Sequence, residues 1–195
     1  SVQKHAAELD RVERSDDALI VSALLLVGVT ATAVAVVVLW AARPMAAIVG
    51  SPEVGRGLVL VAPGIIAFAW NKVLFGALNG RGRLRTYAVM QMLRAALVLA
   101  ALFALIAFAL PGYAVGGIFA LAELMLLPCL LAAVRPSWQT VRGTGAGRAW
   151  WRRHVTFGGR GLVNGILLET HLRVDVVTLS YFVSDRAVGI YAFAG

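Results

Sequence analysis

The 195-residue chain is 60% hydrophobic and only 14% charged, whereas soluble domains are about 45–50% apolar and about 25% charged. This composition excludes an ordinary soluble domain and indicates an integral membrane protein. The single cysteine, Cys129, excludes a disulfide framework and a thiolate metal site, and the net charge of +8 is typical either of nucleic-acid binding or of basic loops that orient a membrane protein.

The first segment, "SVQKHAAELDRVERSDD", is polar and does not have the composition of a signal peptide. Long apolar runs follow it, and each is longer than a strand of a membrane barrel. Because helices need about 20 residues to cross lipid, the sequence predicts an all-α, polytopic integral membrane helix bundle. It has five complete spans plus the start of a sixth near residue 187, the complete ones at 18–40, 57–79, 86–110, 114–134 and 157–182.

The last apolar run, "AVGIYAFAG", is too short to cross a bilayer, so we expect the sequence to be part of a longer protein. The segment 135–156 is the only long polar connector after the first span. We predict a cytoplasmic loop there that joins two bundles, 1–134 and 157–195. A contact of its Trp and Arg residues with anionic lipid is the alternative for this loop.

Basic residues lie mostly in one set of alternating connectors. Eleven of them lie in the segments 1–17, 80–85 and 135–153, against three (Arg43, Arg56 and Arg186) in the other set. Cytoplasmic loops carry the excess of Lys and Arg, so the first set is predicted to be cytoplasmic. This explains the positive net charge, and we expect no nucleic-acid partner.

Charged residues also lie inside predicted spans. Lys72, Arg94 and Glu123 belong to the second, third and fourth spans. An ionisable group at the bilayer centre costs about 2.5–3.5 kcal/mol on insertion scales, so such groups face protein or a wet cavity. Glu123 therefore needs a partner, and the sequence leaves both Lys72 and Arg94 open.

The fifth run carries a polar stripe. On a helix with about 100° per residue, its members fall within about 60° of arc and extend over about 22 Å from the first residue to Asp175. A stripe of this length can line water and contact substrate, although pairing with neighbouring helices is the alternative. The proposed cavity-lining residues are Arg160, Asn164, His171 and Asp175.

Glu169 and Arg173 lie on the opposite side of the same predicted helix. They are four residues apart with the acid first, which is the favourable order for a helical ion pair. We predict a structural pair that packs against another helix.

No enzyme motif is present: the sequence has no phosphate-binding loop, no H-E-x-x-H and no G-x-S-x-G. We expect neither enzymatic activity nor a metal or other cofactor. Helices with Pro and Gly that also carry intramembrane charges are typical of alternating-access transporters.

Two stretches carry a family resemblance, "LNGRGRLRTYAVMQMLRAALVL" and "HLRVDVVTLSYFVSDRAVGIYAFAG". They resemble Wzx-type polysaccharide and O-antigen flippases of the MATE/MOP exporter superfamily, over essentially the whole chain. The resemblance implies a two-bundle flippase fold, in which 1–134 is the second part of the N-terminal bundle and 157–195 starts the second bundle.

The resemblance also implies a function. Such a protein flips an undecaprenyl-diphosphate-linked oligosaccharide across the bacterial inner membrane, in contact with membrane lipids and with H+ or Na+ as a candidate coupling ion. Cations such as Lys72, Arg94 and Arg160 would then bind the diphosphate. The alternatives are a cation-coupled multidrug exporter of the same superfamily, a membrane enzyme acting on lipid-linked sugars and a non-transporting structural subunit.

The charge bias of the connectors predicts which positions face outward. Cysteines introduced at Glu53 and Asp185 should react with an impermeant thiol reagent added to intact cells, and those at Arg83 and Arg148 should not. Reaction at position 83 without reaction at position 185 would reverse the topology.

Overall fold

The computed structural model describes residues 17–136 and, beyond them, residues 167, 174–175, 178–179, 182–183, 187–188 and 190–191. The chain divides into two compact units, Ser1–Trp151 and Arg152–Gly195. The described part of the first unit is helical throughout apart from short turns, which confirms the predicted all-α class for these residues.

Within residues 17–136, four helices are long and apolar enough to cross a membrane. They are α2 (Asp17–Val49), α3 (Pro52–Gly80), α4 (Leu84–Ala107) and α5 (Val115–Val134), the last preceded by the short 3-10 helix η1 (Gly112–Ala114). The first four predicted spans are thus confirmed as helices. The predicted fifth span and the start of a sixth fall almost entirely outside the described residues.

The helix α2, which contains the first predicted span at 18–40, continues beyond that span to Val49. Pro44 lies inside the helix, where proline removes one backbone hydrogen bond, but the alanines and Met45 around it favour helix. The helix ends where Gly50 takes a left-handed conformation with φ 72°, which glycine adopts without a steric penalty. The turn to α3 is closed by a bond from the Ser51 amide to the Ala46 carbonyl, 3.0 Å.

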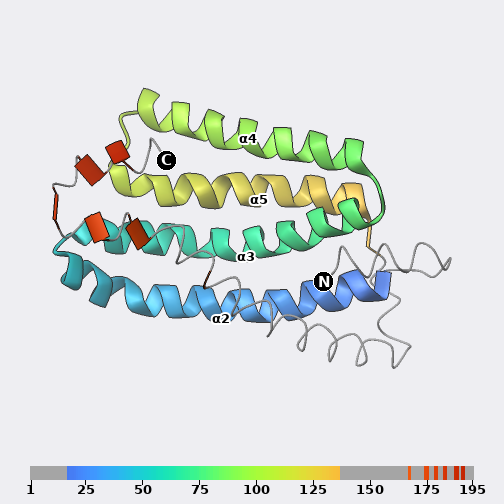
Figure 1. Ribbon diagram of the computed structural model, residues 1–195, viewed down its shortest axis with the longest axis horizontal. Coiled ribbons are helices and arrows are strands. Elements are labelled where there is room, and N and C mark those ends of the chain that lie inside the picture. Colours follow the sequence, from blue (N-terminus) through green and yellow to red (C-terminus); the bar gives the residue numbers. More distant parts are fainter. Residues whose placement is uncertain are drawn as a thin grey trace. The chain divides into compact units, whose positions relative to one another are not determined.

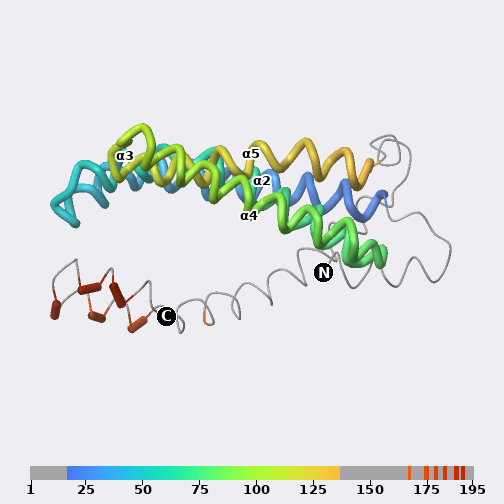
Figure 2. The backbone as a smooth tube through the Cα atoms, turned by 90° about the horizontal axis from the view of Figure 1, so that it is seen from above, coloured from blue at the N-terminus to red at the C-terminus, as the bar shows by residue number. Residues whose placement is uncertain are grey.

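The helices lie side by side in the order α2, α3, α5, α4, which is not their order along the chain (Figure 1). A second view shows all four running along a common direction (Figure 2). Successive helices alternate in direction, so α3 and α5 run the same way. Because α5 lies between α3 and α4, α4 packs mainly on α5 and only slightly on α3, the helix that precedes it.

Small residues let α3 and α5 approach closely near their N-terminal ends. A Cβ atom at Gly64 would lie 2.6 Å from Ala120 Cα, and a Cβ at Gly116 would collide with the carbonyl oxygen of Gly57. Glycine and alanine are the residues that permit such approaches between helices in membranes. We call this contact between α3 and α5 the seam. Further along the two helices, the seam is filled by fully buried leucines, among them Leu78 and Leu130.

Trp70 of α3 links α2 to the seam. Its indole Nε1–H donates a hydrogen bond of 3.0 Å to the backbone carbonyl of Leu24 on α2. Gly28 leaves room for the ring, since a Cβ there would lie 3.0 Å from Trp70 Nε1. A partner for the N–H is what a tryptophan inside a helix bundle requires.

The seam generates a stability prediction. Gly64→Ala should destabilise the protein by about 1–3 kcal/mol, the usual effect of overpacking, because the new methyl group would meet the backbone of α5. Gly112→Ala is the matched control, since a Cβ at Gly112 meets nothing within 4 Å. Thermal unfolding of the purified protein in detergent measures both. Equal melting temperatures for the two variants would contradict the close approach.

Candidate functional site

Glu123 lies on the inner face of α5 with only 1% of its surface exposed. It follows Ala120 by three residues and so faces α3 along the same seam. A carboxylate buried within a membrane span is stable only with partners that satisfy its charge and its oxygen atoms. Both kinds of partner are present.

Arg94 of α4 supplies the positive charge that neutralises the Glu123 carboxylate. Its Nε donates to Glu123 Oε1 at 2.7 Å, and its Nη2 lies 2.5 Å from the same oxygen. Asn71 of α3 satisfies the rest: its Nδ2 donates to Glu123 Oε2 and to the backbone carbonyl of Glu123, each at 2.9 Å. Of the two cations that the sequence left open as partners of Glu123, the structure selects Arg94.

Lys72 lies on the outer side of this pair. Its Nζ is 5.2 Å from the centroid of the Phe68 ring, and the guanidinium carbon of Arg94 is 5.3 Å from the same centroid. Phe68 and Lys72 are one turn apart on α3, so both point to the same side of that helix. Two cations therefore share one aromatic ring, which attracts each of them electrostatically.

We call Phe68, Asn71, Lys72, Arg94 and Glu123 the charge centre. Asn71 and Glu123 are buried, Arg94 is partly exposed and Lys72 is exposed. Among the described residues Lys72 has no carboxylate partner. The centre thus neutralises one cation internally and presents the other outward.

Sequence reasoning placed Lys72 and Arg94 among the candidate binding residues but missed Phe68 and the part played by Asn71. One signal could have found Phe68, namely its spacing of four residues from Lys72 on a predicted helix. The acceptor of Asn71 could not be found that way, because it depends on which helices are neighbours. The Oδ1 atom of Asn71 is buried without a hydrogen-bond partner among the described residues.

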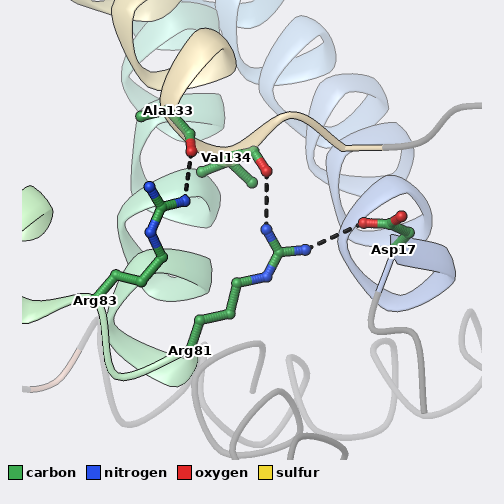
Figure 3. A network of polar contacts seen from close by, with 5 residues as sticks. All are labelled: Asp17, Arg81, Arg83, Ala133 and Val134. Atoms are coloured by element: carbon green, nitrogen blue, oxygen red, sulfur yellow. Dashed lines mark hydrogen bonds and ion pairs between the residues drawn. The ribbon is translucent and has the colours of Figure 1, made fainter. Parts of the chain in front are cut away.

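A second polar cluster closes one end of the helix unit (Figure 3). Arg81 donates to the Val134 carbonyl at 2.8 Å and to Asp17 Oδ1 at 3.1 Å, and Arg83 donates to the Ala133 carbonyl at 2.6 Å. The last carbonyls of a helix lack partners within it and form the negative end of its dipole. Sequence reasoning assigned these arginines only to membrane orientation, and their capping of α5 was missed.

The remaining predicted site residues mostly lie outside the described part of the chain. These are Arg160, Asn164, Glu169, His171 and Arg173, so the polar stripe and the Glu169–Arg173 pair stay predictions. Asp175 is described: its Oδ2 accepts a hydrogen bond of 2.7 Å from the Tyr191 hydroxyl, and both side chains are exposed. Tyr191 had not been predicted as part of any site.

Comparison with known families decides the class of the protein. A model of the polysaccharide biosynthesis protein family matches residues 2–195. The chain belongs to this family. It is the family of the Wzx-type polysaccharide and O-antigen flippases, as the sequence resemblance predicted. Searches among curated proteins and among solved structures gave no match.

Membership of the polysaccharide biosynthesis family, together with four helices able to cross a membrane, makes this a multi-pass membrane protein with a role in polysaccharide transport. The charge centre therefore places three ionisable residues, Lys72, Arg94 and Glu123, within membrane-spanning helices. Residues of this kind are functional candidates by default.

The ion pair generates a prediction about stability. Arg94→Gln should destabilise the protein more than Glu123→Gln, because it leaves a buried carboxylate without its cation, a change that costs about 3–5 kcal/mol. In Glu123→Gln the guanidinium left behind is 29% exposed, so its long side chain can turn toward the membrane interface. The double variant should regain much of the loss. Melting temperatures of the three purified variants measure this, and strictly additive losses would show that the two side chains do not interact.

Proposed function

We propose that the protein is a transporter that flips an oligosaccharide linked to undecaprenyl diphosphate from the cytoplasmic to the periplasmic leaflet of the bacterial inner membrane. Its family membership supports the general class. The observation that carries the specific proposal is the pair of cations, Lys72 and Arg94, on the Phe68 ring. Two cationic groups beside one apolar ring suit an anion that is attached to a lipid.

The depth of these cations supports a functional role. Lys72 lies eight residues before the end of α3, and Arg94 ten residues after the start of α4, which is about 12 Å and about 15 Å along the helices. The hydrocarbon layer is about 30 Å thick, so neither group lies at the water interface. A lysine kept there without a carboxylate among its described neighbours is explained by an anion that passes during transport.

The chemistry follows from the donors. The Lys72 ammonium and the Arg94 guanidinium donate charge-assisted hydrogen bonds to phosphate oxygens. Glu123 and Asn71 hold Arg94 in place, so the guanidinium needs little reorganisation when the anion arrives. Because Glu123 cancels one positive charge, the centre retains a net charge of about +1, and a diphosphate therefore requires further cations.

The polar stripe predicted from the sequence offers further groups for such a substrate. Arg160 is its cation, and Asn164, His171 and Asp175 are the hydrogen-bonding groups that a glycan needs. In the two-bundle fold that the family resemblance implies, these residues would line a wall of the substrate cavity, with alternating access driven by H+ or Na+. The positive sign of the charge centre favours an anionic substrate over the cationic drugs of the multidrug exporters.

The proposal is tested at Lys72. Lys72→Gln should lower surface polysaccharide, normalised to the amount of transporter in the membrane, by about tenfold, because a hydrogen bond to a charged group is worth about 1.5 kcal/mol. Lys72→Arg, which keeps the cation, should retain most of the export.

Arg85→Gln is the matched control. It also removes one exposed basic charge, but at the first turn of α4 and away from the charge centre. Its normalised export should equal that of the unchanged protein. Unchanged export in Lys72→Gln would refute a role of the charge centre in substrate binding.

A further inference from the structure

The end of the helix unit opposite Arg81 carries an apolar groove that plays no part in the proposed transport. It has a volume of about 540 Å³ and lies between the last turns of α2 and the first turns of α3, beside η1. Ala42 and Ala46 of α2 form one wall, and Val59 and Leu60 of α3 form the other. The groove lies within the first unit.

Small residues at the helix crossing shape the floor of the groove. A Cβ at Gly55 would lie 3.0 Å from the Ala42 carbonyl oxygen and 3.1 Å from Ala46 Cβ. The two backbones therefore approach closely, and the larger side chains Val59 and Leu60 stand to one side, 49% and 38% exposed. The result is a furrow with hydrocarbon walls.

Two arginines flank this furrow. Arg43 and Arg56 both line it and are exposed, and the Arg56 guanidinium lies 5.5 Å from the centroid of the Tyr113 ring. No ion pair to either arginine is formed among the described residues. Glu53 lies three residues before Arg56 on α3 but forms no ion pair with it. The two arginines therefore remain available to an anion beside the hydrocarbon furrow.

The depth of the arginines matches the headgroup level. Arg43 lies 26 residues beyond Asp17 on α2, about 39 Å along the axis, which exceeds the hydrocarbon thickness of about 30 Å. Arg56 lies four residues after Pro52, about 6 Å from the start of α3. Tyr113 is of the type that anchors helices at this level. On α3, Val59 and Leu60 lie about one turn further into the helix than Arg56.

We propose that this groove binds one anionic glycerophospholipid, with its phosphate held by Arg43 and Arg56 and one acyl chain in the furrow. Basic pockets between membrane helices recognise anionic headgroups in this way. A zwitterionic lipid would bring its own ammonium group toward the two arginines and is disfavoured by repulsion. Free phosphate would leave the apolar furrow unfilled.

The test is retention of lipid by the purified protein, measured by native mass spectrometry during titration with dioleoyl phosphatidylglycerol or dioleoyl phosphatidylcholine. One phosphatidylglycerol per protein should bind, and phosphatidylcholine should bind at least about tenfold more weakly. Arg43→Gln combined with Arg56→Gln should weaken phosphatidylglycerol binding by about thirtyfold. Arg43→Lys combined with Arg56→Lys should retain most of it, and Arg85→Gln should not change it.

A variant of the wall separates a lipid from a bare anion. Val59→Phe should fill the exposed side of the furrow and weaken phosphatidylglycerol binding while both arginines remain. Unchanged binding in this variant, or complete displacement of the lipid by inorganic phosphate, would overturn the acyl-chain part of the proposal. Equal binding of phosphatidylcholine, or no loss in the double Gln variant, would overturn the site as a whole.

The transport substrate is the remaining candidate occupant. Undecaprenyl phosphate can be titrated against bound phosphatidylglycerol. If it binds the groove more tightly than phosphatidylglycerol does, the groove belongs to the substrate lipid and this proposal is refuted. That result would leave the proposed function intact, because the function is tested at Lys72. A failure at Lys72 would likewise leave the lipid site standing.

Discussion

The buried carboxylate of Glu123 is the constraint on which the described helix unit depends. An ionised carboxylate within a membrane span is stable only while a cation and hydrogen-bond donors surround it. Arg94 and Asn71 fulfil both needs, and they come from α4 and α3, the two long helices that pack on α5. A single side chain thereby fixes how α3, α4 and α5 meet. This matters most for α4, which buries none of its side chains completely and has the ion pair as its strongest polar attachment.

The rest of the α3–α5 seam brings that carboxylate to the right place. Glycine and alanine hold the backbones close at one end, and leucines fill the seam beyond the charge centre. Arg81 and Arg83 then tie the α3–α4 turn to the last carbonyls of α5. Contacts on both sides of Glu123 along α5 thus fix the rotation of this helix about its axis. The charge centre therefore has a defined geometry. A defined geometry is what allows Lys72 and Arg94 to share the Phe68 ring.

Apolar run length was enough to predict the four described helices, because the bilayer sets a minimum length and forbids irregular backbone in lipid. Run length alone did not predict that the helix α2 extends beyond its apolar run, through Arg43 and Pro44, to Val49. The partner of Glu123 could not be predicted, since it follows from the spatial order α2, α3, α5, α4 and not from chain order. Phe68 was missed because an apolar residue in an apolar span is distinguished only by its four-residue spacing from Lys72. Arg81 was understood only as a topology signal because its acceptors, the carbonyls of α5, have no sequence signature.

The separation of Arg94 and Glu123 along the chain bears on how the protein enters the membrane during synthesis. The two residues are 29 positions apart, on helices joined by a short link that turns at Ala109 and η1. Arg94 is synthesised first, and a lone arginine at this depth is poorly inserted. If α4 and α5 leave the translocation machinery together as a helical hairpin, the acid and the base can meet before either contacts lipid. Asn71 would by then already lie in the bilayer, ready to receive the carboxylate. The ion pair would thus act first as an aid to biogenesis and only afterwards as part of the finished transporter.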